Sequence, residues 1–311
     1  MTSGLTGSGL VIVDKPEGWT SHDVVARMRR LAGTRKVGHA GTLDPMATGV
    51  LVVGINKATR LLTYIVGVSK TYTATIRLGQ STITDDAEGD VTSETSAAGV
   101  GEAAVRAAVE RLTGDIEQVP SSVSAIKVNG KRSYAKVRSG EEVKLAARPV
   151  TVSEFSVNGL RRVPAGEELA GGDEGEYLDV DVTVECSSGT YIRALARDLG
   201  GILGVGGHLT ALRRTRVGPY RLDQARTLEQ LAEELTVLDI STAARALLPV
   251  RELTTDEAVE LSFGRRIAAG AGTETVAAFA PDGSLAALLE NKDDAAKPVL
   301  VFAPATGGHQ E

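Results

Sequence analysis

The chain has 311 residues, of which 42% are hydrophobic and 24% charged, and its formal net charge is −6. The length supports two domains or one large domain with an appendage, and the composition is that of an ordinary globular protein. The single cysteine, Cys186, excludes an intramolecular disulfide framework and a cysteine-based zinc cluster, and the four histidines are too scattered to suggest a metal site. We expect a cytoplasmic protein without signal peptide or membrane anchor, because no apolar run approaches the length of a membrane span.

The predicted elements mix strands and helices. A strand at 10–13 is followed by a helix that Thr20 or Ser21 caps and that Gly33 ends. Further along the chain, side-chain periodicity predicts strands at 50–55, 71–78 and 177–184, helices at 102–112, 191–199 and 227–235, and an acidic, glycine-rich mobile loop at 166–175. Because these elements do not follow a strict strand–helix–strand alternation, we predict an α+β fold with a mixed, largely antiparallel sheet.

The last sixty or so residues are predicted to form a separate, small β-rich unit. A helix at 253–263 can be capped by Thr254 or Thr255, and strands at 275–279 and 285–289 are joined by a turn at 281–283, with one more strand at 298–302. We therefore divide the chain into domains at 1–248 and 249–311. The second has no catalytic constellation of its own, which favours a packing or binding appendage.

The charges are segregated along the chain. Basic residues gather at 26–36, 127–148 and 208–216, and acidic residues gather elsewhere, at 85–90, 167–176 and 229–239. One basic segment alone would be interpreted as a solvated surface. Three such segments predict a phosphate-binding face if they converge in space, despite the negative net charge.

A glycine- and proline-punctuated loop at 39–49 places one carboxylate, Asp44, directly before the apolar strand at 50–55. A carboxylate held in position with its charge balanced is a competent nucleophile. An Asp-Pro pair such as Asp44-Pro45 is also an ordinary turn former. Dinucleotide, Walker A, calcium-loop and nucleophile-elbow motifs all fail on spacing or order, so any chemistry would depend on a carboxylate without metal or nucleotide.

Several ordered blocks resemble one known family. They are Asp14 to Ser21, His39 to Leu51, Lys70-Thr71-Tyr72, Gln118 to Ser121 through Lys131, Arg148-Pro149, Gly189 to Arg193 with Asp198-Leu199-Gly200, and Leu212-Arg213-Arg214. In this order they resemble the TruB family of tRNA pseudouridine-55 synthases over roughly residues 9 to 222. The tail from about Arg251 resembles, more weakly, the small PUA-like RNA-binding domain that such enzymes often carry.

The resemblance implies a pseudouridine-synthase-type catalytic domain that isomerises uridine-55 in the T loop of tRNA, as a monomer without cofactor or protein partner. An enzyme that acts on a base must extrude it from the stack and hold it by stacking and edge hydrogen bonds. T-loop recognition is mainly of shape, phosphates and splayed bases, which suits basic segments with a few aromatic residues.

The resemblance also assigns the catalytic roles. It implies that Asp44 is the nucleophile, attacking either C1′ of the ribose or C6 of the uracil. Tyr72 would stack on the target base and take part in proton removal, although a tyrosine in an alternating strand is otherwise a core residue. Arg193 would pair with Asp44 and keep it ionised, although such an arginine could otherwise contact phosphate or lie on the surface.

Other positions match the family's substrate-binding and supporting residues. His39 would occupy the space that the flipped base leaves in the RNA, and Tyr191 and Leu212 would form pocket walls. The remaining expected substrate-binding residues are cations: Lys127, Lys131, Arg132, Arg213 and Arg214. The expected supports of the Asp44 loop are Lys15, Pro16, Gly41 and Pro45.

Two alternatives remain. A non-catalytic RNA-binding or RNA-folding protein could keep this fold, but the intact set of Asp44, Tyr72 and Arg193 argues against it. A guide-RNA-dependent relative is disfavoured because the chain has no lysine-rich tail or extra partner-docking block. The preferred tRNAs, the oligomeric state and the role of the acidic segment 166–176 stay open.

Overall fold

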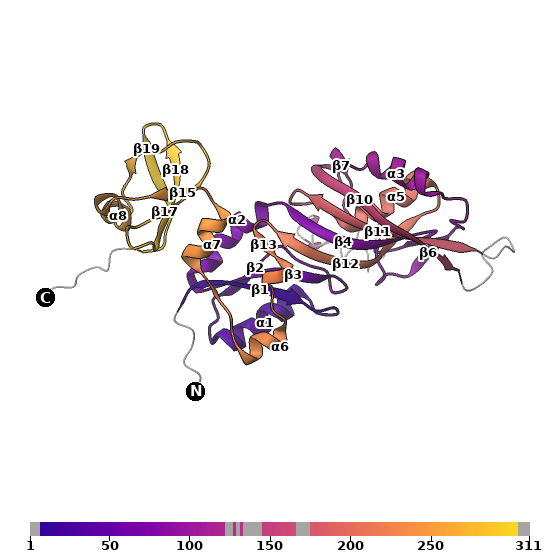
Figure 1. The fold of residues 1–311 in the computed structure, drawn as a ribbon, viewed down its shortest axis with the longest axis horizontal. Helices are drawn as coiled ribbons and strands as arrows, with labels where there is room; N and C mark the ends of the chain where they lie inside the picture. The colour runs from indigo at the N-terminus through magenta and orange to yellow at the C-terminus, as the bar shows by residue number, and fades with distance from the viewer. Residues whose placement is uncertain (1–6, 122–126, 129–130, 133–144, 166–174, 304–311) are drawn as a thin grey trace.

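The computed structural model describes residues 7–121, 127–128, 131–132, 145–165 and 175–303. A ten-stranded sheet extends through the molecule, and a separate five-stranded sheet lies at one end (Figure 1). The strands of the large sheet are ordered β14-β1-β3-β12-β4-β11-β10-β7, with β2 beside β3 and β13 beside β12. Among the described strands, the only parallel pairs are β3 with β12 and β15 with β17. The prediction of an α+β fold with a mixed, largely antiparallel sheet is confirmed.

One half of the large sheet is covered on both faces. Its strands are β1 (Gly9–Lys15), β2 (Val37–Ala40), β3 (Thr48–Ile55) and β14 (Leu238–Asp239). Val11 and Val13 pack with helices α1 (Ser21–Ala32) and α6 (Leu228–Glu233). Leu10 and Ile12 point to the other face, because side chains alternate along a strand. There they join a cluster with α2 (Leu62–Gly67) and α7 (Ile240–Leu247).

Within the described residues, helices cover the other half of the sheet on one face only. Its strands are β4 (Lys70–Leu78), β7 (Gly114–Gln118), β10 (Arg148–Pro164), β11 (Glu176–Cys186), β12 (Gly207–Val217) and β13 (Tyr220–Arg221). Apolar residues of β4 and β11 pack in one cluster with α3 (Glu102–Glu110) and α5 (Ile192–Leu203). The opposite face is polar; there Thr75 and Arg77 donate hydrogen bonds to Asp181 and Asp179.

The remaining short elements are β5 (Gln80–Thr82), β6 (Val91–Glu94), β8 (Lys127–Val128), β9 (Lys131–Arg132), the 3₁₀ helix η1 (Asn56–Leu61), which follows β3, and the 3₁₀ helix η2 (Leu222–Gln224), which follows β13. The predicted loop at 166–175 lies, except for its last residue, outside the described residues.

The two halves of the sheet meet at a narrow junction. β3 and β12 pair through only two positions, Thr48 with Arg213 and Gly49 with Arg214. Gly49 has a φ of +96°, and a Cβ on it would overlap the backbone carbonyl of Arg214. The junction therefore requires glycine at position 49, both for backbone conformation and for close strand approach.

We expect Gly49→Ala to lower the free energy of unfolding by about 4 kcal/mol, the sum of an unfavourable φ and a steric overlap. Gly114→Ala is the matched control, because Gly114 has a φ of +92° and no atom near the position of an added Cβ. Its expected cost is only about 1–2 kcal/mol. Urea denaturation of both variants measures the difference in the free energy of unfolding. Equal losses of stability would show that the close approach of β3 to β12 does not contribute to the effect.

The start and end of α1 agree with the sequence prediction. Thr20 is the N-cap and forms a reciprocal capping box with Asp23, and Gly33 ends the helix in the left-handed conformation. These are the end signals expected of a helix. The cap matters for the site, because it fixes the helix next to the loop at 41–47.

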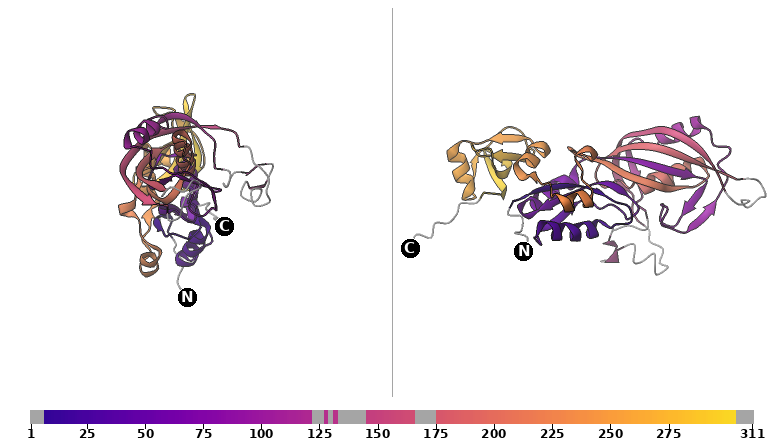
Figure 2. Two further views of the ribbon diagram at one scale, coloured as in Figure 1. Left: turned by 90° about the vertical axis from the view of Figure 1, so that its right-hand side faces the viewer. Right: turned by 60° about the horizontal axis from the view of Figure 1, so that its bottom comes forward.

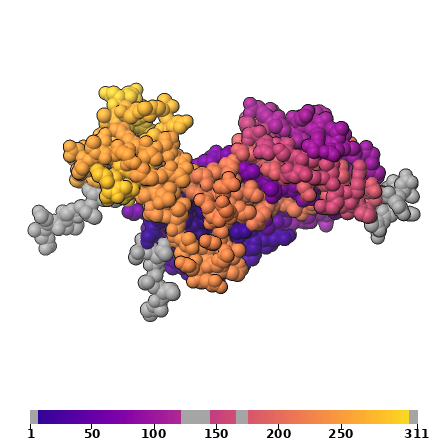
Figure 3. All heavy atoms as spheres, viewed as in Figure 1, coloured from indigo at the N-terminus to yellow at the C-terminus, as the bar shows by residue number. Residues whose placement is uncertain are grey.

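The C-terminal sheet is ordered β15-β17-β18-β19-β16. Its elements are β15 (Val250–Glu252), α8 (Thr255–Ser262), β16 (Ile267–Ala268), β17 (Val276–Phe279), β18 (Leu285–Lys292) and β19 (Ala295–Val301). Lys57 and Arg60 of η1 donate hydrogen bonds to the carbonyls of Phe302 and Val301, 2.7 Å each. The small sheet thus stands against the β1–β3 half and away from the half that carries α3 (Figure 3). Division of the chain after residue 248 stays a prediction.

None of the helices in the described part of the chain is long and apolar enough to cross a membrane.

Candidate active site

Asp44 lies in a loop whose backbone is held from several sides. The hydroxyl of Ser21, the first residue of α1, accepts from the amide of Leu43 at 2.9 Å and donates to its carbonyl at 3.1 Å. The carbonyl of Pro45 accepts from the amide of Gly18 at 2.9 Å. The side chain of Asp44 itself is 39% exposed. Because its neighbours are fixed while its carboxylate stays accessible, the loop presents a positioned acid to solvent or to a ligand.

Lys15 contacts this loop from inside the fold. Its buried ammonium donates to the carbonyls of Pro16 (2.9 Å), Trp19 (2.6 Å) and Pro45 (3.1 Å). Burial lowers the pKa of Lys15 to about 8, so the side chain remains an ammonium at neutral pH. The contacts join the turn after β1 to the loop of Asp44.

The burial of Arg214 contradicts the prediction that this residue binds substrate. It was expected to bind substrate phosphate, but its side chain is only 1% exposed. Its guanidinium donates to the carbonyls of Val50 (2.8 Å) and Gly41 (3.0 Å) and reaches that of Thr42 at 3.5 Å. Arg214 therefore braces the Asp44 loop and cannot reach phosphates on the surface.

Arg193 joins Asp44 to a second carboxylate. Its Nε lies 3.1 Å from Oδ2 of Asp44, and its Nη1 lies 3.3 Å from Oδ2 of Asp86 and donates to the carbonyl of Thr84 at 2.9 Å. Asp86 is almost fully buried, with 3% of its side chain exposed. The guanidinium is thus fixed on its far side by Asp86 and Thr84 and balances the charge of Asp44 on its near side.

The acidic segment around Asp86 was not expected at the site. Its backbone bridges to β12, where the amide of Leu209 donates to the carbonyl of Asp85 at 3.1 Å. Glu88 follows; burial raises its pKa, and so do the negative charges of Asp86 and Asp44. No sequence motif indicates that this segment lies at the site, because it is distant in the chain from both Asp44 and Arg193.

Tyr72 lies within the apolar wall beside the loop. It belongs to the same cluster as Leu43, Met46 and Leu212. Burial raises the pKa of Tyr72, and the neighbouring Arg214 opposes that shift. The ring is therefore a neutral phenol at physiological pH, beside a guanidinium that would stabilise its ionised form.

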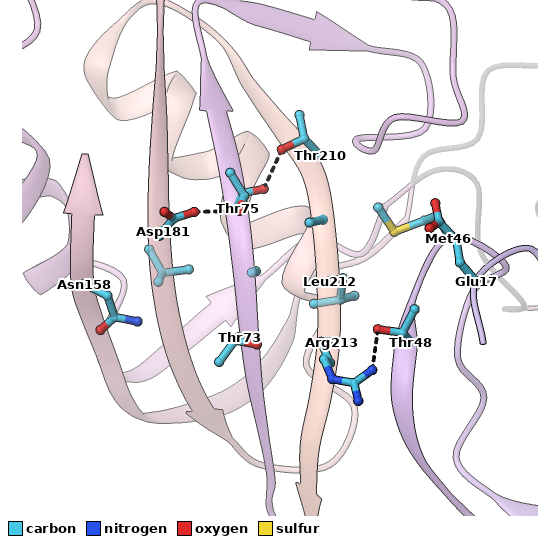
Figure 4. Close-up of a pocket in the computed structure, with 13 residues that line it drawn as sticks. Glu17, Met46, Thr48, Thr73, Thr75, Asn158, Asp181, Thr210, Leu212 and Arg213 are labelled. Carbon is cyan, nitrogen blue, oxygen red and sulfur yellow. Dashed lines mark hydrogen bonds between the residues drawn. The ribbon is translucent and has the colours of Figure 1, made fainter. Parts of the chain in front are cut away.

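A cavity of about 420 Å³ opens next to this wall, between the loop and the polar face of the sheet. Figure 4 shows Met46 and Glu17 on one side of it and Leu212 and Arg213 of β12 on the other. Thr75 bonds Asp181 and Thr210 along its floor. Asp44, Tyr72 and Arg193 do not line this cavity themselves. The cavity therefore adjoins the Asp44 loop only through Met46, and its size suits part of a nucleotide.

Tyr191 and His39 also lie near the site. Tyr191 is the N-cap residue of α5, two positions before Arg193, and the buried amide of Gln118 binds both its backbone amide (2.8 Å) and its carbonyl (3.1 Å). Gln118 thereby orients the start of the helix that carries Arg193. The ring of His39 contacts that of His22, and burial together with the nearby His22 lowers the pKa of His39. His39 is therefore neutral at physiological pH.

The expected phosphate-binding cations divide into two groups. Arg213 is partly exposed but pairs with Asp14 at 2.7 Å, and Arg216 on the same strand pairs with Glu185 at 2.9 Å. The arginines of the basic segment 208–216 thus form ion pairs and hydrogen bonds with other residues of the protein. For Lys127, Lys131 and Arg132 the structure gives only the backbone of two short paired strands, and their side chains lie outside the described residues.

No cluster of three or more His, Cys, Asp or Glu side chains in the described ranges is arranged to hold a metal ion.

Comparison of the sequence with protein-family models agrees with the fold described above. Residues 29–192 match the model described as TruB family pseudouridylate synthase, N-terminal domain. The chain belongs to the TruB family. Residues 193–254 and 248–303 match the descriptions "tRNA pseudouridylate synthase B C-terminal domain" and "tRNA Pseudouridine synthase II, C terminal".

Relatives in the TruB family extend over almost the whole chain. A protein from Arthrobacter sp. (strain FB24), named tRNA pseudouridine synthase B, is 75% identical over 96% of this chain and 97% of its own. One of the same name from Thermobifida fusca (strain YX) is 60% identical over 95% of this chain and 98% of its own.

Two solved structures share the TruB-type fold. One is a chain of an H/ACA ribonucleoprotein bound to a substrate RNA containing 2′-deoxyuridine, 26% identical, with a TM-score of 0.69 over 96% of this chain and 86% of that one. The other is an archaeal box H/ACA Nop10–Cbf5 complex, also 26% identical, with a TM-score of 0.68 over 96% and 87% of the two chains.

Proposed function

We propose that this TruB family member isomerises uridine-55 in the T loop of tRNA to pseudouridine, with Asp44 as nucleophile. The observation that carries the proposal is the accessible Asp44 carboxylate, 3.1 Å from a buried arginine and held by a loop pinned on both sides. The names of the relatives support the tRNA substrate.

The reaction is an isomerisation that balances without a cofactor. The bond from C1′ to N1 breaks, the uracil turns, and a bond from C1′ to C5 forms; the proton on C5 leaves and N1 gains one. Asp44 attacks C1′ or C6 and departs again at the end. Arg193 orients the carboxylate and balances its charge before the attack, because its Nε lies 3.1 Å from Oδ2 of Asp44.

Tyr72 is proposed to contact the everted base. Its ring lies in the wall with Leu43, Met46 and Leu212, where a planar base can stack. The candidate acceptor for the proton lost from C5 is the Tyr72 phenolate, which forms when the hydroxyl releases its own proton to solvent and which Arg214 stabilises; the proton from C5 then regenerates the phenol, and N1 takes its proton from solvent. Eversion of the base is required in any such mechanism, and His39, being neutral, can enter the vacated stack without burying a charge.

We propose further that the protein acts as a cytoplasmic monomer without a protein partner, unlike the structural relatives in ribonucleoprotein complexes. The test uses purified protein alone, an unmodified tRNA transcript and no cofactor, with pseudouridine mapped by position. The expected product is a single pseudouridine at position 55, and a transcript with cytidine there should stay unmodified. Modification elsewhere, or none, would contradict the proposal.

We expect RNA binding to weaken steeply with salt, because phosphate contacts release counterions. Arg29, Arg30, Arg35 and Lys36 are exposed at the end of α1 and just after it. If these four contact phosphates, affinity should fall roughly 50- to 150-fold between 50 and 200 mM salt. Filter binding over this range measures the slope, and a flat response would show that the basic segment does not face the RNA.

A further inference from the structure

A second, shallow cavity of about 330 Å³ lies on the exposed side of α1. Gly18, Trp19, Asp23, Ala26 and Arg30 line it. Trp19, the single tryptophan of the chain, is 37% exposed. The small side chain of Ala26 leaves the hollow open, since a larger residue would extend into it. An aromatic ring and a guanidinium thus border one open space.

The charges at this cavity suit an anionic ligand. In the part of the chain that the structure describes, Arg30 forms no ion pair with any carboxylate. The one acid in the lining, Asp23, accepts hydrogen bonds from the amide and hydroxyl of Thr20 as the helix cap, and those bonds lower its pKa. Its negative charge is therefore directed to the helix end, and Arg30 stays available.

The cavity is connected to the candidate active site through short contacts. The carbonyl of Trp19 accepts from the ammonium of Lys15, which also donates to the carbonyl of Pro45, the residue after Asp44. Ser21, two residues after Trp19, is bonded to Leu43. The start of α1 and the loop of Asp44 are therefore one rigid assembly, and α1 extends from it along the face that comes forward in the right-hand view of Figure 2.

We propose that this cavity is a second RNA contact, in which a nucleotide base of the substrate stacks on Trp19 and its phosphate binds Arg30. The inference rests on the proposed function for the identity of the RNA. A sequence-tolerant contact to single-stranded nucleotides combines an aromatic platform with a cation for the backbone, and both are present here. An RNA bound with its uridine at Asp44 would be held at two points of one rigid body.

Because Trp19 is the only tryptophan, the unmodified protein reports on the contact directly. Tryptophan fluorescence is recorded while a full-length tRNA transcript is added, and binding is followed in parallel by filter retention. We expect the fluorescence to be quenched with the same concentration dependence as binding. Full binding with unchanged fluorescence would overturn the inference, whereas absence of RNA binding would contradict the proposed function instead.

Substitutions test the energetic contribution. Trp19→Ala and Arg30→Ala should each weaken transcript binding about 5- to 100-fold, while Trp19→Phe, which keeps a stacking ring, should restore most of it. Arg111→Ala, an exposed arginine at the end of α3 on the other half of the molecule, is the matched control. Urea denaturation confirms that each variant is folded. If Arg111→Ala weakened transcript binding as much as Arg30→Ala, the effect would reflect only the loss of one positive charge, and the inference would be overturned.

The kinetic pattern separates a binding contact from damage to the catalytic loop. If Trp19 is a binding contact, Trp19→Ala raises KM for the transcript and keeps the single-turnover rate at saturating RNA, since loss of an interaction equal in ground and transition state changes KM alone. A fall in the saturated rate equal to the fall in affinity would mean that Trp19 supports the loop, and would overturn the proposed contact. An isolated T-arm hairpin that quenches as the transcript does would place the stacked nucleotide within the T arm.

Discussion

Asp44→Asn is expected to lower the rate of pseudouridine formation by at least about four orders of magnitude while RNA affinity stays within roughly tenfold of wild type. The amide is close in shape to the carboxylate but is a poor nucleophile. The loop should keep its conformation, because Ser21, Lys15 and Arg214 hold its backbone and none of them requires the side chain of Asp44.

Single-turnover assays and filter binding on the same preparation measure the two effects. Asp115→Asn is the control, since Asp115 is an exposed carboxylate on β7 that bonds Thr151 at a distance from the site. A parallel loss of affinity and turnover in Asp44→Asn would argue that residue 44 positions RNA and does not carry out the chemistry.

Arg193→Met is expected to reduce both activity and stability. The rate should fall about a thousandfold, because Asp44 loses the charge that orients it. Unfolding should become easier by about 3–5 kcal/mol, because Asp86 is left as a buried carboxylate without its cation.

The double variant Arg193→Met/Asp86→Asn separates these effects. With both buried charges removed, most of the stability should return, whereas the activity should not. Urea denaturation and single-turnover assays provide the comparison. If the double variant were as unstable as the single one, the role of Asp86 as the fixed partner of Arg193 would be wrong.

Local signals in the sequence predicted the elements that position the site. The helix after Thr20 could be placed because its cap, its apolar spacing and its terminal Gly33 all agree. The strand after Asp44 could be placed because it is a short apolar run. Both depend on neighbours in the chain, which a single sequence records.

Contacts between residues that are distant in the chain were harder to predict from the sequence. Asp86 belongs to an acidic segment that resembles any solvated loop until β12 and α5 are folded against it. Arg213 and Arg214 were both expected to bind substrate, from their charge and from the family resemblance of the block Leu212-Arg213-Arg214. Since neighbouring side chains of a strand point to opposite faces, treating 207–217 as a strand would have shown that only one of the two could face a ligand.

A crystal structure of the Asp44→Asn variant with a T-arm RNA tests the central claim most directly. We expect an everted uridine-55 stacked on Tyr72, with C1′ or C6 about 3–3.5 Å from the side chain of residue 44. Whichever atom lies closer identifies the bond that the carboxylate forms. A uridine still stacked within the RNA loop, or everted away from residue 44 and Arg193, would contradict the account.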